Sequence, residues 1–218
     1  MHLKGLLVKD YLMLSAQRRF MLLALIMMIV ISVSANNGSF VIGYCAFMGS
    51  LMGTNSISYD DYNHGYSFLM TLPFTRKEYV LEKFIFCLSC VVLFSVVGAL
   101  IALVGQMMRG LNETYLMSFG LTYLILIWIA FLIAAIMLPV QLHFGSERAR
   151  IAFAIVMLSL FVLVIGGIKL TEGLPIQLDP IISQLSLPLM VGVGIGILGV
   201  AFALSYSISL AIMQRKEF

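Results

Sequence analysis

The stretch SYDDYNHGYSFLMTLPFTRKEY, residues Ser58–Tyr79, is a charged and aromatic island between two apolar runs. The chain carries no charged residue from Phe20 to Tyr59, nor from Phe84 to Met108. A bilayer core about 30 Å thick needs roughly 20 apolar residues per helix. Both runs are long enough to cross a membrane, so we interpret the island as the connection between transmembrane helices.

The composition of the whole chain indicates the same class of protein. Of its 218 residues, 61% are hydrophobic and 11% are charged, and the mean hydropathy is +1.07. Soluble domains carry roughly 25% charged residues. Helices satisfy every backbone hydrogen bond within one segment, as the bilayer interior requires. The sequence therefore predicts an all-α integral membrane protein.

The uncharged runs predict six transmembrane helices within a single transmembrane domain over residues 1–218. The polar residues ANNGS, 35–39, divide the first long run in two. The expected spans lie at about 19–35, 39–57, 75–107, 114–143, 148–169 and 183–213. An even number of spans puts both termini on the same side.

The basic residues indicate which side that is. Of the 13 Lys and Arg residues, all but Arg109 and Lys169 fall on the side of the termini. Such an excess is typical of cytoplasmic loops, so we expect both termini and the island to be cytoplasmic. The net charge of +3 then reflects loops that face anionic lipid and indicates no nucleic-acid partner.

Residues 1–18 are expected to form an interfacial amphipathic helix. The apolar residues lie near one face, and the charged residues Lys4, Lys9, Asp10 and Arg18 lie elsewhere. The apolar set is Leu3, Leu6, Leu7 and Met13 or Leu14. A disordered cytoplasmic tail is the alternative. The run after Arg19 also has the composition of a secretory signal, and we expect it to be retained as the first span.

Several short patterns are not expected to carry chemistry. GIGILG, Gly194–Gly199, has the dinucleotide-binding spacing but follows no strand, and no P-loop motif occurs. The chain also lacks H-E-x-x-H and G-x-S-x-G. We therefore predict no catalytic residue and no metal site, and interpret the cysteines, including CLSC at Cys87–Cys90, as buried thiols. The pairs Gly49 with Gly53 and Gly192 with Gly196 have the spacing that lets helices approach closely.

The end of the island has the pattern of a helix start. Thr75 is the expected N-cap and Glu78 its capping-box partner, while Phe74 and Tyr79 occupy the positions of a hydrophobic staple. Asp60 and Asp61 are expected to cap a short helix that ends at Pro73. Residues 58–74 would then form a short surface helix joined to a long third span, although an ordinary interfacial hairpin is the alternative.

Three segments resemble ABC-2 type permeases, the membrane subunits of ATP-binding-cassette (ABC) exporters. DDYNHGYSFLMTLPFTRKEYVLEKF is similar to that family's segment between spans two and three, and LPVQLHFGSERARIAFAI, Leu138–Ile155, to its second cytoplasmic turn. LKGLLVKDYL resembles its opening helix. The likeness covers essentially the whole chain, and is greatest to small bacterial permeases that export phenol-soluble modulins and other amphipathic peptides.

The resemblance implies a fold like that of type V exporters and a role without catalysis by this chain. The permease would lie in the bacterial cytoplasmic membrane as a dimer with a second copy or a paralogue, and dock on two ABC ATPase subunits. ATP and Mg²⁺ would bind to those ATPases, so this chain would hold no cofactor.

The resemblance also implies which residues make the ATPase contacts. The loop between spans two and three would act as a coupling helix lodged in a cleft of the ATPase. Its residues would be Asp60, Asp61, Tyr62, Asn63, His64, Tyr66, Phe68, Leu69, Thr75, Arg76, Lys77 and Glu78. A second cytoplasmic contact would comprise Gly145, Glu147, Arg148 and Arg150.

The leading hypothesis is thus an exporter permease for an amphipathic peptide or another hydrophobic compound, powered by a separate ATPase. Long uncharged runs and 15 methionines favour such cargo over a small ion, since methionine gives an adaptable apolar surface. The alternative is a non-enzymatic polytopic membrane scaffold or sensor, and a membrane-embedded hydrolase ranks third.

Overall fold

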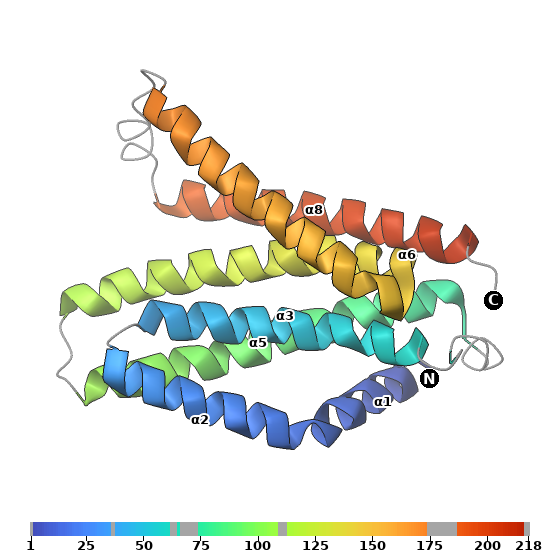
Figure 1. The fold of residues 1–218 in the computed structure, drawn as a ribbon, viewed down its shortest axis with the longest axis horizontal. Helices are drawn as coiled ribbons and strands as arrows, with labels where there is room; N and C mark the ends of the chain where they lie inside the picture. The colour runs from blue at the N-terminus through green and yellow to red at the C-terminus, as the bar shows by residue number, and fades with distance from the viewer. Residues whose placement is uncertain are drawn as a thin grey trace.

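The computed structural model describes residues 2–35, 38–61, 65, 74–108, 113–173 and 187–215. These residues form helices and include no strand. The helices are α1 (His2–Ala16), α2 (Arg18–Ala35), α3 (Gly38–Asp61), α5 (Arg76–Met107), α6 (Glu113–Gly173) and α8 (Leu187–Arg215) (Figure 1). The predicted all-α class is confirmed for this part of the chain.

The helices form an elongated bundle around α3. Helix α3 packs against α5 and α6, α2 packs against α5, and α8 packs against α6. The start of α1, the end of α3, the start of α5 and the end of α8 all lie at one end of the bundle, on the right in Figure 1. We call this the terminal end.

Helix α6 consists of two limbs, residues 113–144 and 146–173, that meet at Gly145. The backbone of Gly145 has φ 70° and ψ −177°, a conformation that residues with a Cβ rarely adopt. The chain reverses direction here, at the terminal end (Figure 1). The reversal falls between the expected spans 114–143 and 148–169.

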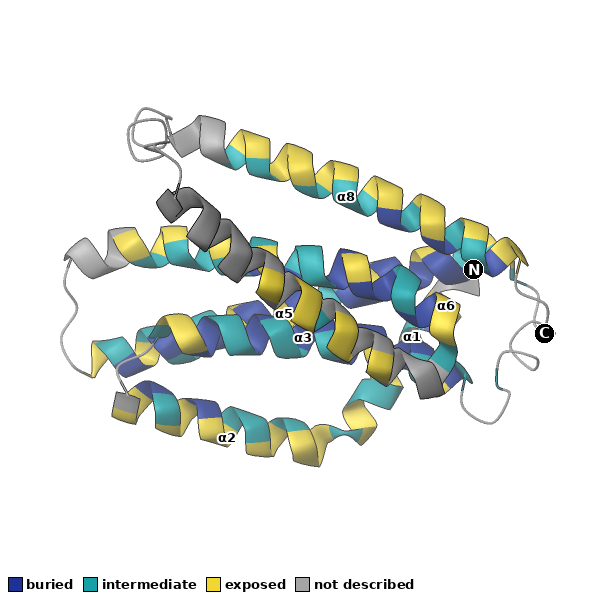
Figure 2. Ribbon diagram, turned by 45° about the horizontal axis from the view of Figure 1, so that its top comes forward, coloured by how far each residue is buried: buried dark blue, intermediate teal, exposed yellow. Residues whose placement is uncertain are grey.

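Burial differs strongly between the helices, as Figure 2 shows. The apolar window of α3 is 61% buried, whereas that of α8 is only 11% buried. Large apolar side chains point outward from α2 and α8, among them Leu23, Ile26, Val200 and Leu204. Soluble proteins rarely expose such continuous apolar faces, so these faces fit contact with lipid.

Four of the described helical segments are long and apolar enough to cross a membrane: Gly38–Asp61, Arg76–Met107, Ser118–Gly145 and Val191–Arg215. The pair Lys4–Ala16 and Arg18–Ser34, bent by 63°, makes a fifth if it is counted as one span. The protein is thus an integral membrane protein with several spans. The total of six and the cytoplasmic side of the termini stay predictions.

Glycines let α3 and α5 touch through their backbones. A Cβ atom on Gly53 would lie 2.6 Å from Cys87 Cα, and one on Gly49 would lie 2.7 Å from the carbonyl oxygen of Cys90. The expected close approach is confirmed for this pair. For Gly192 and Gly196 no described atom lies within 4 Å of such a Cβ, so their expected close approach stays a prediction. Cys45, Cys87 and Cys90 are buried free thiols, as expected.

We predict that Gly53→Ala lowers the stability of the bundle while Gly192→Ala does not. A methyl group at residue 53 must push α3 and α5 apart, and such overpacking costs about 1–3 kcal/mol. Thermal unfolding of both variants in detergent checks this. Equal melting temperatures for the two variants would show that the helices are not in backbone contact.

Candidate functional site

Five ionisable residues from three helices meet at the terminal end. Lys9 and Asp10 come from α1, Asp60 from α3, and Glu82 and Lys83 from α5. Asp10, Glu82 and Lys83 are 0% exposed and Asp60 is 5% exposed, while Lys9 lies at the edge. We call these five residues the buried charge cluster.

Lys83 is the centre of the cluster. Its Nζ lies 2.5 Å from Asp10 Oδ2 and 2.7 Å from Asp60 Oδ2. The same ammonium group donates to Ser56 Oγ at 3.1 Å. One side chain of α5 therefore binds α1 and α3 at once.

Two further side chains close the cluster around Asp60. The Tyr79 hydroxyl donates to Asp60 Oδ2 at 3.0 Å. Lys9 donates to Asp60 Oδ1 and lies 3.2 Å from Asp10 Oδ1. Asp60 of α3 and Lys83 of α5 thus each contact both of the other helices, whereas α1 binds α3 through Lys9 and α5 through Asp10.

The cluster is stable only as a unit. Removing one partner of a buried ion pair leaves an uncompensated buried charge, which costs about 3–5 kcal/mol. Glu82 Oε2 also lies 3.6 Å from Lys83 Nζ, so this buried carboxyl depends on the same ammonium group. Separating α1 from α3 and α5 would leave several such groups unpaired.

The start of α5 has the geometry that its sequence predicts. Thr75 Oγ1 accepts from the backbone N–H of Glu78 at 3.2 Å, and the Thr75 N–H donates to Glu78 Oε2 at 2.7 Å. The Phe74 and Tyr79 rings stack with centroids 6.4 Å apart. The predicted capping box and hydrophobic staple are confirmed, and together they fix the direction in which the chain enters α5.

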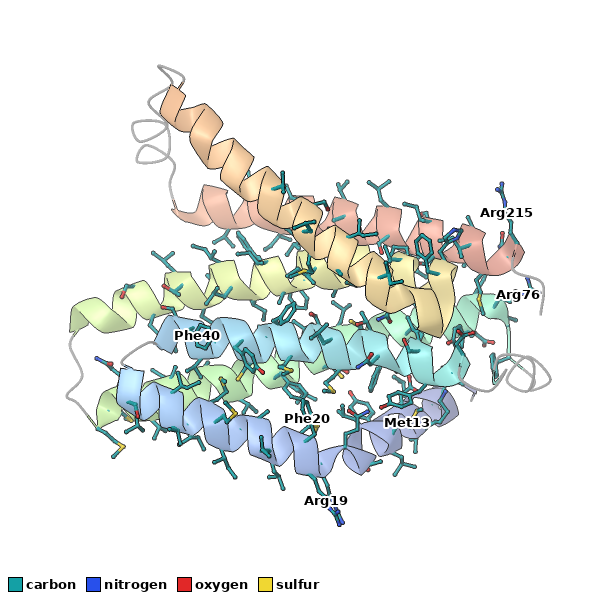
Figure 3. All side chains as sticks on the ribbon, viewed as in Figure 1. Met13, Arg19, Phe20, Phe40, Arg76 and Arg215 are labelled. Carbon is teal, nitrogen blue, oxygen red and sulfur yellow. The ribbon has the colours of Figure 1, made fainter. Side chains whose placement is uncertain are left out.

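Arg76 ties this helix start to the end of α8. Its guanidinium donates to the carbonyl oxygens of Met213 and Gln214 at 2.9 and 2.7 Å. Figure 3 shows Arg76 close to the last turn of α8. Carbonyls at a helix C-terminus lack partners within the helix, and a cation there also complements the helix dipole.

The two segments that are expected to contact the ATPase lie next to each other at Asp61 and Gly145. A Cβ on Gly145 would lie 2.8 Å from Asp61 Oδ2. The end of α3 therefore lies directly against the turn of α6. Any side chain at residue 145 would push this carboxylate away, in addition to straining the backbone.

The structure changes the interpretation of Asp60 and Asp61. They were expected to cap a short helix, but they are the last two residues of α3, because that helix continues beyond its uncharged run. Asp60 is also buried and its carboxylate points inward at Lys83, which does not suit a surface contact. Lys77 is exposed at the start of α5.

The structure describes only some of the other residues that are expected to contact the ATPase. Those outside the described residues are Tyr62, Asn63, His64, Tyr66, Phe68 and Leu69. Glu147, Arg148 and Arg150 lie in the second limb of α6, and their side chains are outside the described part.

The buried charge cluster was missed by the sequence analysis, although a signal for it exists. Asp10 was placed on a polar face, yet Leu6 and Asp10, four residues apart, share the buried face, while Val8 and Leu12 are exposed. An acid on the apolar face of a helix requires a buried partner. Lys83 was interpreted only as the charged boundary of an apolar run.

A family model described as ABC-2 family transporter protein matches residues 5–214. No curated protein and no solved structure matches the chain.

We predict that Lys83→Met strongly destabilises the protein while Lys77→Met leaves it nearly unchanged. Loss of the Lys83 ammonium leaves Asp10 and Asp60 buried without their main partner, at a cost of about 3–5 kcal/mol. Thermal unfolding in detergent checks the difference. Equal melting temperatures for the two variants would contradict the central position of Lys83.

Proposed function

Because the chain belongs to the ABC-2 family of transporter proteins, we propose that it is the permease subunit of an ABC exporter for an amphipathic peptide or another hydrophobic compound. Family membership makes it the membrane component of an ABC transporter and not the catalytic one. It also implies ABC ATPase partners. Export, the class of cargo, two ATPase subunits, a permease dimer and a bacterial cytoplasmic membrane belong to the proposal.

The observation that carries this proposal is the way the structure holds both ends of residues 62–73. This segment leaves α3 after Asp61, which lies against Gly145, and it returns to α5 at the capping box of Thr75. Asp60 is held by Lys83 and Tyr79. A segment whose two ends are fixed to the bundle is suited to pass a displacement on to the helices.

Helix α5 extends this connection along the bundle. With 32 residues and a rise of 1.5 Å per residue, it is about 48 Å long. Its first turn is bound to α8 through Arg76 and its second to α1 and α3 through Lys83. If the terminal end faces the cytoplasm, the ATPases would contact it there. Their closure on ATP would then favour one of two conformations of the bundle, because a partner shifts such an equilibrium when it interacts differently with the two conformations.

The proposed cargo class rests on the apolar character of the described helices. The charged residues of α5 are confined to its first turns, since Phe84–Met107 carries no Asp, Glu, Lys or Arg. Thr54 and Ser95 donate to carbonyl oxygens of their own helices. Such surfaces suit a hydrophobic or amphipathic molecule better than a hydrated ion.

We predict that an ABC ATPase co-purifies with the wild-type protein from its native cells, and that replacing residues 62–69 by Gly and Ser abolishes this. This replacement spares Asp60 and Asp61, so the buried charge cluster stays intact. Replacement of residues 109–112, between α5 and α6, is the matched control. If the wild type captures no ATPase, the exporter proposal fails and a membrane scaffold or sensor takes its place.

Single substitutions test whether residues 62–73 couple cargo binding to ATP hydrolysis, separately from whether they bind the ATPase. We predict that Tyr66→Ala and Phe68→Asp each reduce ATP hydrolysis stimulated by a hydrophobic cargo, measured in reconstituted vesicles, without preventing membrane insertion. Both substitutions would remove apolar contact area from the proposed ATPase cleft. Undiminished stimulation in correctly inserted variants would exclude this segment as the coupling element.

A further inference from the structure

A groove runs between the first limb of α6 and α8. It consists of two hollows of about 510 and 420 Å³ that share His143, Ile208 and Ile212 as lining residues. Each volume lies within the range of roughly 300–1,000 Å³ that is usual for ligand sites. We call the two hollows together the α6–α8 groove.

The groove is apolar along its length and basic at one end. The larger hollow is lined mainly by aliphatic side chains, including Leu132, Ile136 and Leu204. Among the described lining residues the one hydroxyl, Ser205 Oγ, already donates to the carbonyl oxygen of Ala135 at 2.5 Å. The smaller hollow extends to Arg215 in the last turn of α8.

The length of the apolar part matches one leaflet of a bilayer. On α6 its lining runs from Leu132 to Phe144, which is about 18 Å at 1.5 Å per residue. Half of a hydrocarbon core about 30 Å thick is about 15 Å. The groove therefore spans the depth of a single acyl layer and stops at the terminal end.

The basic end lies where the headgroups of that leaflet would be. Figure 3 shows Arg215 at the terminal end, extending from the last turn of α8. Arg76 already binds the carbonyl oxygens of Met213 and Gln214, and Arg215 makes no ion pair with the residues that the structure describes. Its guanidinium can therefore bind an anion, and this group suits the bidentate geometry of phosphate.

We propose that the α6–α8 groove binds an anionic phospholipid, with an acyl chain along the apolar part and the phosphate at Arg215 and His143. Basic pockets between transmembrane helices on the cytoplasmic side are known to hold anionic headgroups. A ring N–H of His143 can donate to a phosphate oxygen in either protonation state. This proposal depends on the location of the chain in a membrane and does not depend on the proposed export function.

A phospholipid fits this groove better than a helical peptide. A peptide helix is about 10 Å wide. It would need a broad apolar groove with polar groups along the rim. The basic groups are instead gathered at one end, one leaflet length from the other end of the groove. This distribution matches a molecule with one anionic head and an extended apolar tail.

Native mass spectrometry tests the proposal directly. The purified full-length protein is exchanged into detergent containing equal amounts of phosphatidylglycerol and phosphatidylcholine, and the retained lipid is measured. We expect the wild type to retain phosphatidylglycerol preferentially. Arg215→Gln should reduce that preference about fivefold, the effect of one basic residue at a membrane surface.

Two further variants separate the groove from general surface charge. Ile208→Trp should reduce retention of both lipids by filling the groove, and residue 208 is 51% exposed, so the larger ring can be accommodated. Arg19→Gln is the control, because Arg19 points away from the bundle at the α1–α2 bend (Figure 3), and it should change nothing.

Four outcomes would overturn the proposal. The first is equal retention of the two lipids by the wild type. The second is an equal effect of Arg19→Gln and Arg215→Gln, which would indicate general surface charge. The third is lipid retention that Ile208→Trp leaves unchanged. The fourth is a co-purified peptide that is retained in place of lipid and is lost in Ile208→Trp.

Discussion

The ammonium group of Lys83 lies between the carboxylates of Asp10 and Asp60, and the arrangement of the terminal end depends on this contact. It joins three helices that are far apart in the sequence. Each charge would be costly inside the bundle without its partners. The contact therefore favours the packed arrangement of α1, α3 and α5 over arrangements in which these helices are partly separated. This holds even if the ion pairs add little to the free energy of unfolding.

Other contacts of the terminal end are built around this cluster. Tyr79 belongs to both the hydrophobic staple of α5 and the hydrogen bonds of Asp60, so the start of α5 and the end of α3 are fixed by one side chain. Arg76 adds α8, and Asp61 adds the turn of α6 at Gly145. The connection at residues 62–73 therefore begins and ends on a surface to which α1, α3, α5, α6 and α8 all contribute.

The sequence predicts the local features of this structure better than the distant ones. The capping box of Thr75 and Glu78 depends on residues three apart, and the close contact at Gly49 and Gly53 on a spacing within one helix. The cluster depends on pairs such as Asp10 with Lys83, which no spacing rule connects. Asp60 and Asp61 were misplaced because the end of an uncharged run was equated with the end of a helix, although α3 continues past it. Gly192 and Gly196 have the same spacing as the α3 pair, but that spacing does not say which helix would pack against them, and the described residues supply no neighbour there.

Hydrogen exchange of α1 tests the central claim most directly, because it needs neither the ATPase nor the cargo. The detergent-solubilised wild type is compared with Asp10→Asn, in which Lys83 keeps Asp60 as a partner. If the cluster holds α1 on the bundle, the amides of α1 exchange slowly in the wild type and much faster in the variant. Those of α3 and α5 should change little. Fast exchange of α1 in the wild type, or equal exchange in both proteins, would contradict the role of the cluster in docking α1.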